Sequence, residues 1–272
     1  MEKIKEALAK AKTATQFVES KPKARNLAHK ATLMSDVEDI EYLNTPVINL
    51  NPSHLEKNRI ITYNQDDPFS IVFDLLRTQV LRIMEENNWH SIAIVSPTPE
   101  SGKTFTAINL AISIANQPAK TVMLVDFDLR RPRVASYLGL KISKSLNDYI
   151  EGSATIEDII VNPGIPKLVV LPTVKSVKKS AEIIGSDKIR NLIDDISTRY
   201  QSRVIIFDLP PMLSSDDAIA MLPMVDCVLV VVGNGLSSQA EIEDTLYHIP
   251  KEKLLGIVMN KAEVEPRAYY HY

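Results

Sequence analysis

Short apolar runs alternate with longer segments of helical spacing through most of the chain. Runs rich in Val, Ile and Leu predict buried strands at residues 92–96, 121–125, 168–171, 203–207, 228–232 and 255–259. Between them, apolar residues recur every three or four positions, as in residues 69–84 and 105–115, which predicts amphipathic helices. This alternation indicates an α/β fold with a mostly parallel sheet and helices on both faces.

The first sixty or so residues have a different pattern. Ile4, Leu8 and Ala11 fall on one face of a predicted helix among lysines, and a basic stretch then gives way to an acidic one. We expect a helix and flexible linker over residues 1–60, a folded domain over residues 61–265 and a tail over residues 266–272. The alternative for the first segment is docking to a partner or an anionic membrane surface.

Composition narrows the class of protein. A chain of 272 residues with 45% hydrophobic content can bury a large core, and a net charge of −3 gives no reason to expect nucleic-acid binding. The single cysteine, Cys227, lies in an apolar run and fits a reducing compartment. The longest apolar run is too short to span a bilayer, and the N-terminus does not resemble a signal peptide. We therefore expect a cytoplasmic protein.

The most informative stretch is Gly102-Lys103-Thr104, between a predicted strand and a predicted helix. In this context the triplet is typical of a phosphate-binding loop: helix N–H groups face the phosphates, the lysine reaches the terminal phosphates and the threonine ligates Mg²⁺. The fold would then be of the P-loop NTPase type. We expect the nucleotide to contact Pro99, Glu100, Ser101, Gly102, Lys103, Thr104 and Phe105.

Carboxylates follow two of the predicted strands. Asp126 and Asp128 end one, and Asp208 ends another, ahead of Pro210-Pro211. Ligands of parallel sheets bind at this edge. Asp126 and Asp128 are therefore candidates for binding Mg²⁺ through water and for accepting a proton from an attacking hydroxyl, and Asp208 for the magnesium water shell.

Three other polar residues near these strand ends, Arg130, Arg131 and Asn260, have two interpretations each. Arg130 and Arg131 are expected either to contact phosphates or to be solvated cations. Asn260, at the end of the last strand, is either a hydrogen-bond partner for a purine base or a turn amide. Ser214, Ser215, Asp216 and Asp217 are expected to cap the next helix.

The phosphate loop, Asp126-x-Asp128-x-Arg130-Arg131-Pro132 and Phe207-Asp208-x-Pro210-Pro211 together resemble the bacterial protein-tyrosine autokinases of capsule and exopolysaccharide synthesis, the BY-kinases. The resemblance covers roughly residues 60–272. These kinases are related to the partition and septum-positioning ATPases, whose phosphate loop carries an additional lysine near its beginning. Thr98 stands at that place here, which favours the kinase branch.

The resemblance implies roles for individual residues, with ATP and Mg²⁺ as cofactors. Lys103 would contact the phosphates; Asp126 and Asp128 would be the paired catalytic aspartates, with Asp126 as the base. Thr104, Asp126 and Asp208 would surround the magnesium ion. The phosphoacceptors implied by the family's C-terminal tyrosine cluster are Tyr269, Tyr270 and Tyr272.

The implied function is ATP- and Mg²⁺-dependent autophosphorylation that regulates exopolysaccharide or capsule polymerisation and export. The implied partners are an integral-membrane polysaccharide chain-length or export protein as activator, a tyrosine phosphatase, and further copies of the chain. The activator would hold the protein at the inner face of the cell membrane. The family's association helix often carries Glu-x-x-Arg-x-x-Arg, and the corresponding places here are Ile71, Asp74 and Arg77.

Two alternatives belong to other classes of protein. One is a positioning-type ATPase switch that transfers no phosphate to tyrosine. The other is a nucleotide-binding scaffold without catalysis, suggested by Pro97 in place of the first loop glycine and by the carboxylate of Glu100.

Overall fold

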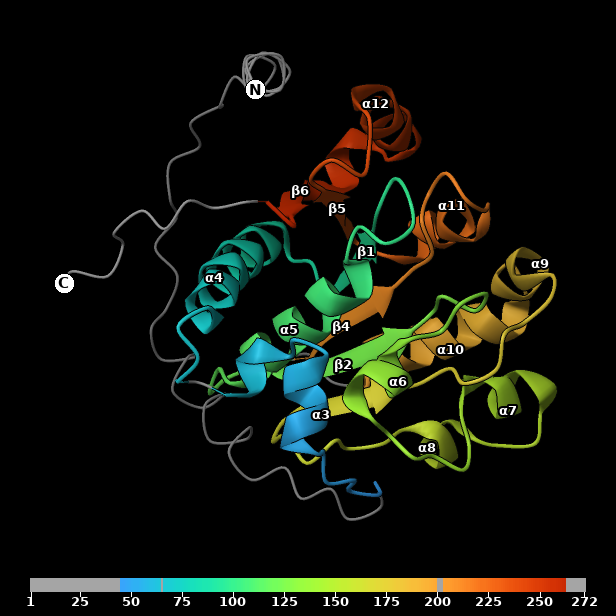
Figure 1. Ribbon diagram of the computed structural model, residues 1–272. Helices are drawn as coiled ribbons and strands as arrows, with labels where there is room; N and C mark the ends of the chain where they lie inside the picture. The colour runs from blue at the N-terminus through green and yellow to red at the C-terminus, as the bar shows by residue number, and fades with distance from the viewer. Residues whose placement is uncertain (1–44, 65, 200–202, 263–272) are drawn as a thin grey trace, which may run out of the picture.

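The computed structural model describes residues 45–64, 66–199 and 203–262. Its centre is a six-stranded sheet in the order β3-β2-β4-β1-β5-β6, and every pair of neighbouring strands is parallel (Figure 1). The strands are β1 (Ser91–Val95), β2 (Thr121–Asp126), β3 (Leu168–Leu171), β4 (Arg203–Asp208), β5 (Cys227–Gly233) and β6 (Leu254–Asn260). The predicted strands are confirmed, each within one residue at either end.

Helices cover both faces of the sheet, as predicted, because its inner strands are apolar on both sides. In β1, Ile92 and Ile94 belong to one core cluster, and Ala93 and Val95 belong to the other. Four helices pack their apolar residues into the first cluster: α3 (Pro52–Lys57), α4 (Ser70–Asn87), α5 (Lys103–Ala115) and α6 (Val134–Leu138).

Six helices of the described part of the chain lie on the opposite face. These are α7 (Leu146–Glu151), α8 (Ile156–Ile159), α9 (Ser180–Ile184), α10 (Asp187–Thr198), α11 (Asp217–Met221) and α12 (Gln239–His248). Three single turns of 3₁₀ helix lie at Ile61–Tyr63, Leu222–Met224 and Lys251–Lys253. α9 ends at Ile184, and Ser186 then caps α10 with its side chain.

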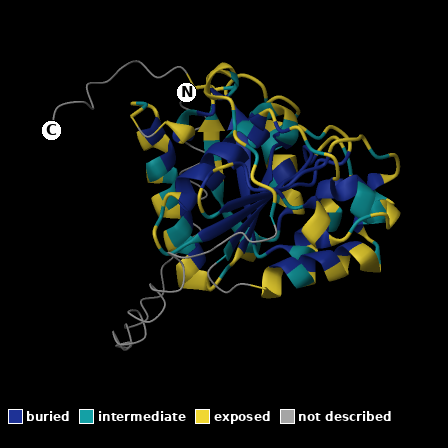
Figure 2. Ribbon diagram, turned by 90° about the horizontal axis from the view of Figure 1, so that it is seen from below, coloured by how far each residue is buried: buried dark blue, intermediate teal, exposed yellow. Residues whose placement is uncertain are grey.

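Helix α5 is buried along most of its length. All residues from Thr106 to Ala115 are buried, because the sheet lies on one side and α4 and residues 55–62 cover the other. Figure 2 shows the buried sheet in the middle of the molecule and exposed residues on the outer helices. A loop that leads into α5 is therefore attached to the most rigid part of the fold.

Residues 46–60 pack against the domain. The Ile48 N–H donates to the Asn162 carbonyl at 2.8 Å, and the Asn162 N–H donates to the Pro46 carbonyl at 3.0 Å. Leu55 and Ile60 are buried in the core. The division predicted from the sequence, with a boundary near residue 60, stays a prediction, and these contacts favour an earlier boundary. The predicted helix at the N-terminus and the tail tyrosines lie outside the described residues.

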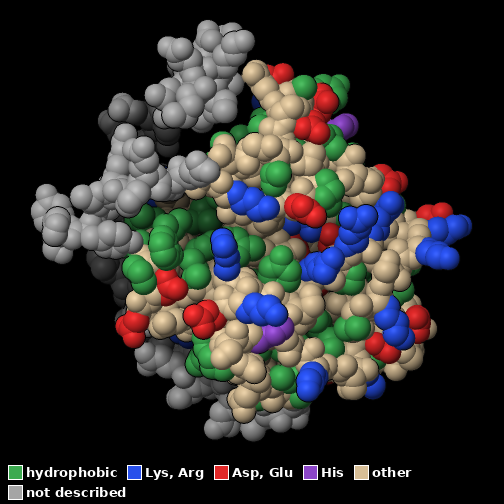
Figure 3. Space-filling model, in the orientation of Figure 1, with side chains coloured by type: hydrophobic (Ala, Val, Ile, Leu, Met, Phe, Trp, Pro, Cys, Tyr) green, Lys and Arg blue, Asp and Glu red, His purple; other side chains and the backbone are tan. Residues whose placement is uncertain are grey.

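The outer face of α4 exposes apolar side chains, including those of Ile71, Val72 and Leu75. Figure 3 shows this hydrophobic surface on the left of the molecule, over α4. Within the described residues, no helix combines the length and the apolar character that a membrane span requires.

Candidate active site

The phosphate loop connects β1 to α5 and is held by its own side chains. The hydroxyls of Ser96 and Ser101 both donate to the Thr98 carbonyl, at 2.8 and 3.0 Å. Glu100 has a positive φ of 63° and is exposed at the surface of the loop. The first N–H groups of α5 lack carbonyl partners within the helix, so this loop and helix start form a cradle for an anion.

Gly102 is required by the shape of the loop. Its φ is 94°, a left-handed conformation that glycine adopts without strain. A Cβ atom there would collide with the Asn260 side-chain amide, which donates to the Ser101 carbonyl at 2.9 Å. Asn260 thus braces the phosphate loop, and its predicted contact with a purine base stays a prediction.

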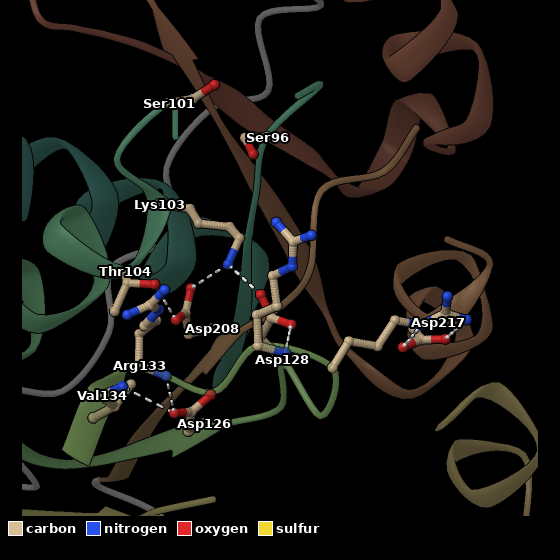
Figure 4. A network of polar contacts seen from close by, with 12 residues as sticks. Ser96, Ser101, Lys103, Thr104, Asp126, Asp128, Arg133, Val134, Asp208 and Asp217 are labelled. Atoms are coloured by element: carbon tan, nitrogen blue, oxygen red, sulfur yellow. Dashed lines mark hydrogen bonds and ion pairs between the residues drawn. The ribbon is translucent and has the colours of Figure 1, made fainter. Parts of the chain in front are cut away.

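The three predicted carboxylates meet around Lys103 (Figure 4). Parallel pairing of β2 with β4 sets Asp126 beside Asp208 at the carboxyl edge of the sheet. Lys103 Nζ lies 2.7 Å from Asp128 Oδ2 and 3.8 Å from Asp208 Oδ1. The Thr104 hydroxyl donates to Asp208 Oδ2 at 2.6 Å.

Backbone groups hold Asp126 in place. Its Oδ2 accepts hydrogen bonds from the N–H groups of Arg133 and Val134, both at 2.9 Å. Its Oδ1 is buried and has no hydrogen-bond partner among the described residues, and the same holds for Asp208 Oδ1. Among the described residues, Asp208 Oδ1 thus has only its ion pair with Lys103 at 3.8 Å and Asp126 Oδ1 has no bonding partner, which is a costly arrangement unless a ligand completes it.

The electrostatics of the site follow from burial and charge. Burial, and then the charge of Asp208, raise the pKa of the Asp126 carboxyl well above its usual range. Burial also raises the pKa of Asp208, against the opposing effect of Lys103. Burial lowers the pKa of the Lys103 amino group, but the charges of Asp208 and Asp128 outweigh it, so this pKa is raised and the lysine stays charged.

These residues fit a magnesium nucleotide. Thr104 and the Oδ1 atoms of Asp126 and Asp208 supply the hard oxygen atoms that Mg²⁺ prefers. Across the described ranges, no group of three or more His, Cys, Asp or Glu side chains is arranged to hold a metal ion alone. Mg²⁺ would accordingly need water and phosphate oxygens as its remaining ligands, as is usual for this ion.

Two of the other predicted nucleotide contacts, Phe105 and Arg130, have partners within the protein. The Phe105 ring packs edge-on against Phe73 of α4, with the ring centroids 5.6 Å apart. Arg130 forms an ion pair with Asp217, at 3.1 Å. Whether these two residues also contact a nucleotide stays a prediction.

The predicted capping of α11 is wrong. Asp216 occupies the N-cap position, but no side chain makes a capping hydrogen bond. Asp217 is instead fully buried and pairs with Arg130. Local sequence favoured capping because Ser and Asp before a helix usually serve that purpose. The sequence did contain a signal for this pairing. Arg130 and Arg131 are adjacent cations, and a cation that is held in place needs an acidic partner.

A parallel sheet with a Gly-Lys-Thr loop between β1 and α5, and with carboxylates at the ends of β2 and β4, defines a P-loop nucleoside triphosphatase fold. A family model described as an AAA domain matches residues 90–253, more than half of the chain. The chain therefore belongs to this AAA-domain family.

Relatives within this class confirm the resemblance to bacterial tyrosine kinases. The chain is 28% identical over 208 residues to the tyrosine-protein kinase Ptk of Acinetobacter johnsonii, covering 76% of this chain and 28% of that kinase. It is 27% identical over 223 residues to the tyrosine-protein kinase YwqD of Bacillus subtilis, covering 81% of this chain and 92% of that kinase. The chain thus spans little more than a quarter of the first relative and most of the second.

Solved structures agree with the fold. The kinase domain of the Escherichia coli tyrosine kinase Etk superposes with a TM-score of 0.69 at 25% identity, covering 84% of this chain and 94% of that domain. The septum site-determining protein MinD of Pyrococcus horikoshii, complexed with Mg-ADP, gives a TM-score of 0.53 at 21% identity, covering 65% of this chain and 74% of that one. The MinD structure supports the fold alone.

Proposed function

We propose that this protein is an ATP- and Mg²⁺-dependent protein-tyrosine autokinase that phosphorylates tyrosines of its C-terminal tail. One observation carries the proposal: Lys103, Thr104, Asp126, Asp128 and Asp208 converge at the end of the phosphate loop. The similarity to bacterial tyrosine-protein kinases supports the choice of reaction.

Each residue has a role that its contacts support. Lys103 and the N-terminus of α5 would hold the terminal phosphates, and Thr104 and Asp208 would hold the water shell of the metal. ATP supplies the phosphoryl group when bound, and Mg²⁺ neutralises its charge. Asp126 has a raised pKa and a free carboxylate oxygen, which suit it to accept the proton of an incoming tyrosine hydroxyl.

The wider proposal concerns regulation and location. An integral-membrane polysaccharide chain-length or export protein would activate the kinase and hold it at the inner face of the cell membrane, and a phosphatase would reverse the modification. The reaction would regulate the polymerisation and export of an exopolysaccharide or capsule. Self-association is supported by the exposed apolar side chains on α4, since such surfaces often mark contacts between proteins.

Asp74 and Arg77 form hydrogen bonds with each other and with Ser113, so they brace α4 against α5.

The first experiment is the intact mass of the purified protein after incubation with ATP and Mg²⁺, with and without a cytoplasmic fragment of the candidate activator. We expect phosphate increments that map to Tyr269, Tyr270 or Tyr272 and are absent in Lys103→Met. The matched control is Lys120→Met, which removes a lysine paired with Glu85 away from the site and should retain the increments.

Other outcomes select the alternatives. ATP hydrolysis without phosphotyrosine would favour a positioning-type ATPase switch. Absence of both activities under both conditions would favour a nucleotide-binding scaffold.

A further inference from the structure

Arg130, which lies outside the phosphate loop, forms hydrogen bonds with three side chains. Arg130 Nε donates to Asp217 Oδ2 at 3.1 Å, and its Nη2 donates to Asp217 Oδ1 at 3.1 Å. The same Nε also lies 3.0 Å from the Ser180 hydroxyl, and Nη2 lies 3.4 Å from Asp216 Oδ1. Asp217 and Ser180 are both fully buried. Two parallel hydrogen bonds to one carboxylate fix the guanidinium plane as well as its charge.

The contact joins three separate parts of the chain. Arg130 and Asp128 lie in the loop that follows β2, whose last residue is Asp126, whereas Asp217 begins α11, at the end of the loop that follows Asp208 in β4. Ser180 begins α9. The side chain of Arg130 therefore joins the two loops that follow the strands ending in Asp126 and Asp208. Figure 4 shows Asp217 well apart from Lys103, with Asp128 between them.

Two hydrogen bonds also attach the loop after β2 to the segment that precedes α9. The Val177 N–H donates to the Leu129 carbonyl at 2.8 Å, and the Ser176 hydroxyl donates to the Arg130 carbonyl at 2.8 Å. The segment before α9 thus packs along the loop from 127 to 131. Releasing Arg130 would leave the buried Asp217 carboxylate without its cation, which is strongly unfavourable.

We infer that Asp217 is a positioning residue that acts through Arg130: this pair fixes the loop that follows β2, and with it Asp128, relative to the loop that follows β4. Arg130 then holds the loop after β2 in place and does not bind the nucleotide phosphates. The inference rests on the proposed function for its effect on phosphoryl transfer. Its structural part, the coupling of the two loops, can be measured without any reaction.

The test is a double-mutant cycle with Arg130→Gln, Asp217→Asn and the two combined. For each folded variant, three quantities are measured: the dissociation constant of Mg-ADP, the rate of tyrosine phosphorylation at saturating ATP, and the hydrogen exchange of residues 127–131 and 209–216. Arg199→Gln is the matched control, because it removes an arginine paired with Asp195 and Glu157 at the surface.

We expect each single variant to lower the saturated transfer rate by about 10- to 100-fold, as loss of positioning does. Mg-ADP affinity should change by less than about threefold, because the pairing of β2 with β4 holds Asp126 and Asp208 in place without this contact. The double variant should be no worse than either single one, since both break the same contact. Exchange in both loops should rise in all three, and the control should match the wild type.

Three results would overturn the inference. A loss of Mg-ADP affinity in Arg130→Gln that is absent in Asp217→Asn would make Arg130 a phosphate ligand. Additive effects of the two substitutions would show that the residues act separately. Unchanged exchange in both loops would show that the pair does not fix them, even if the wild type proved to have no kinase activity. If exchange rises as expected while the wild type transfers no phosphate, the coupling stands and the proposed function fails.

Discussion

Asp126 combines full burial, two backbone hydrogen bonds to one oxygen and no partner for the other. Its pKa in the folded protein is raised, first by burial and then by the charge of Asp208. An unfolded aspartate has a pKa of about 3.9, so the unfolded chain binds fewer protons than the folded one between that value and the raised pKa. The ionised carboxylate therefore makes the nucleotide-free protein less stable as pH rises through this window.

We predict that Asp126→Asn stabilises the nucleotide-free protein. The amide oxygen can still accept the N–H groups of Arg133 and Val134, and no charge is buried. The gain in the free energy of unfolding should be absent near pH 4 and should grow towards neutral pH. Urea unfolding at a series of pH values measures it.

Asp148→Asn is the control with the opposite sign. Hydrogen bonds from the Ser145 backbone lower the pKa of Asp148, so this substitution should cost stability at neutral pH and little in acid. A variant Asp126→Asn that is less stable than the wild type at neutral pH would contradict the account of the buried charge.

Gly102 allows a second prediction at the scale of one residue. Gly102→Ala should weaken Mg-ADP binding by about tenfold or more, because a left-handed alanine costs roughly 1–2 kcal/mol and 1.4 kcal/mol is a factor of ten. Its Cβ would also displace the Asn260 amide. Combining it with Asn260→Ala removes the collision but not the strain, so titration calorimetry should find only partial recovery. Full recovery would mean that the collision alone matters.

At the scale of elements, Asn109 connects α5 to the segment before α4. Its Oδ1 accepts hydrogen bonds from the Thr62 N–H and hydroxyl at 3.1 and 3.0 Å, and its Nδ2 donates to the Arg59 carbonyl at 3.3 Å. Residues 59–62 are thus attached to the helix that begins at the phosphate loop.

We predict that Asn109→Ala lowers the free energy of unfolding by about 2–3 kcal/mol, because it leaves the N–H and the hydroxyl of the buried Thr62 without their acceptor. Hydrogen exchange should rise at residues 59–63. The control is Asn87→Ala, at the exposed end of α4, whose single bond to the Ile83 carbonyl should be worth less than about 0.5 kcal/mol. Equal effects of the two substitutions would mean that the segment is only loosely attached.

The elements themselves were predictable because each strand is an apolar run with polar or turn residues at its end. Lys103 and Asp208 were predictable as site residues for the same reason, since a strand end or a helix start fixes where each one lies. The pairing of Arg130 with Asp217 was not, because the two residues are 87 positions apart and Asp217 suits a local cap. The same limit applies to Asn260 and Ser101, which are 159 positions apart.

At the scale of the whole molecule, the strand order decides which parts of the chain meet. In the order β3-β2-β4-β1-β5-β6, the phosphate loop after β1 lies next to Asp208 on β4, and Asp126 lies one strand further. β6, which precedes the tail, is at the opposite edge from β3. Neighbouring strands are about 4.8 Å apart, so β6 lies roughly 19 Å from β2 across the sheet.

This spacing leads to a prediction about which copy supplies the tyrosine. A hydroxyl that attacks in line must approach from the side of Asp126 and Asp128. Nine residues lead from Asn260, the end of β6, to Tyr269 and reach about 31 Å only when fully stretched, so crossing the sheet uses most of that length and leaves little for folding back around the phosphate loop. The tail of a second copy has no such restriction, so we expect Tyr269 to be phosphorylated between copies.

Mixing two defective proteins tests this. One is Lys103→Met with all tail tyrosines intact, and the other is catalytically intact with Tyr269, Tyr270 and Tyr272 changed to phenylalanine. Transfer between copies should place phosphate on the Lys103→Met protein, at an initial rate per molecule that rises with total protein concentration. A Lys103→Met protein without tail tyrosines should remain unlabelled. If the mixture stays unlabelled while the wild type labels itself at a rate independent of concentration, the tail reaches its own site, and the path from β6 must be shorter than the strand order implies.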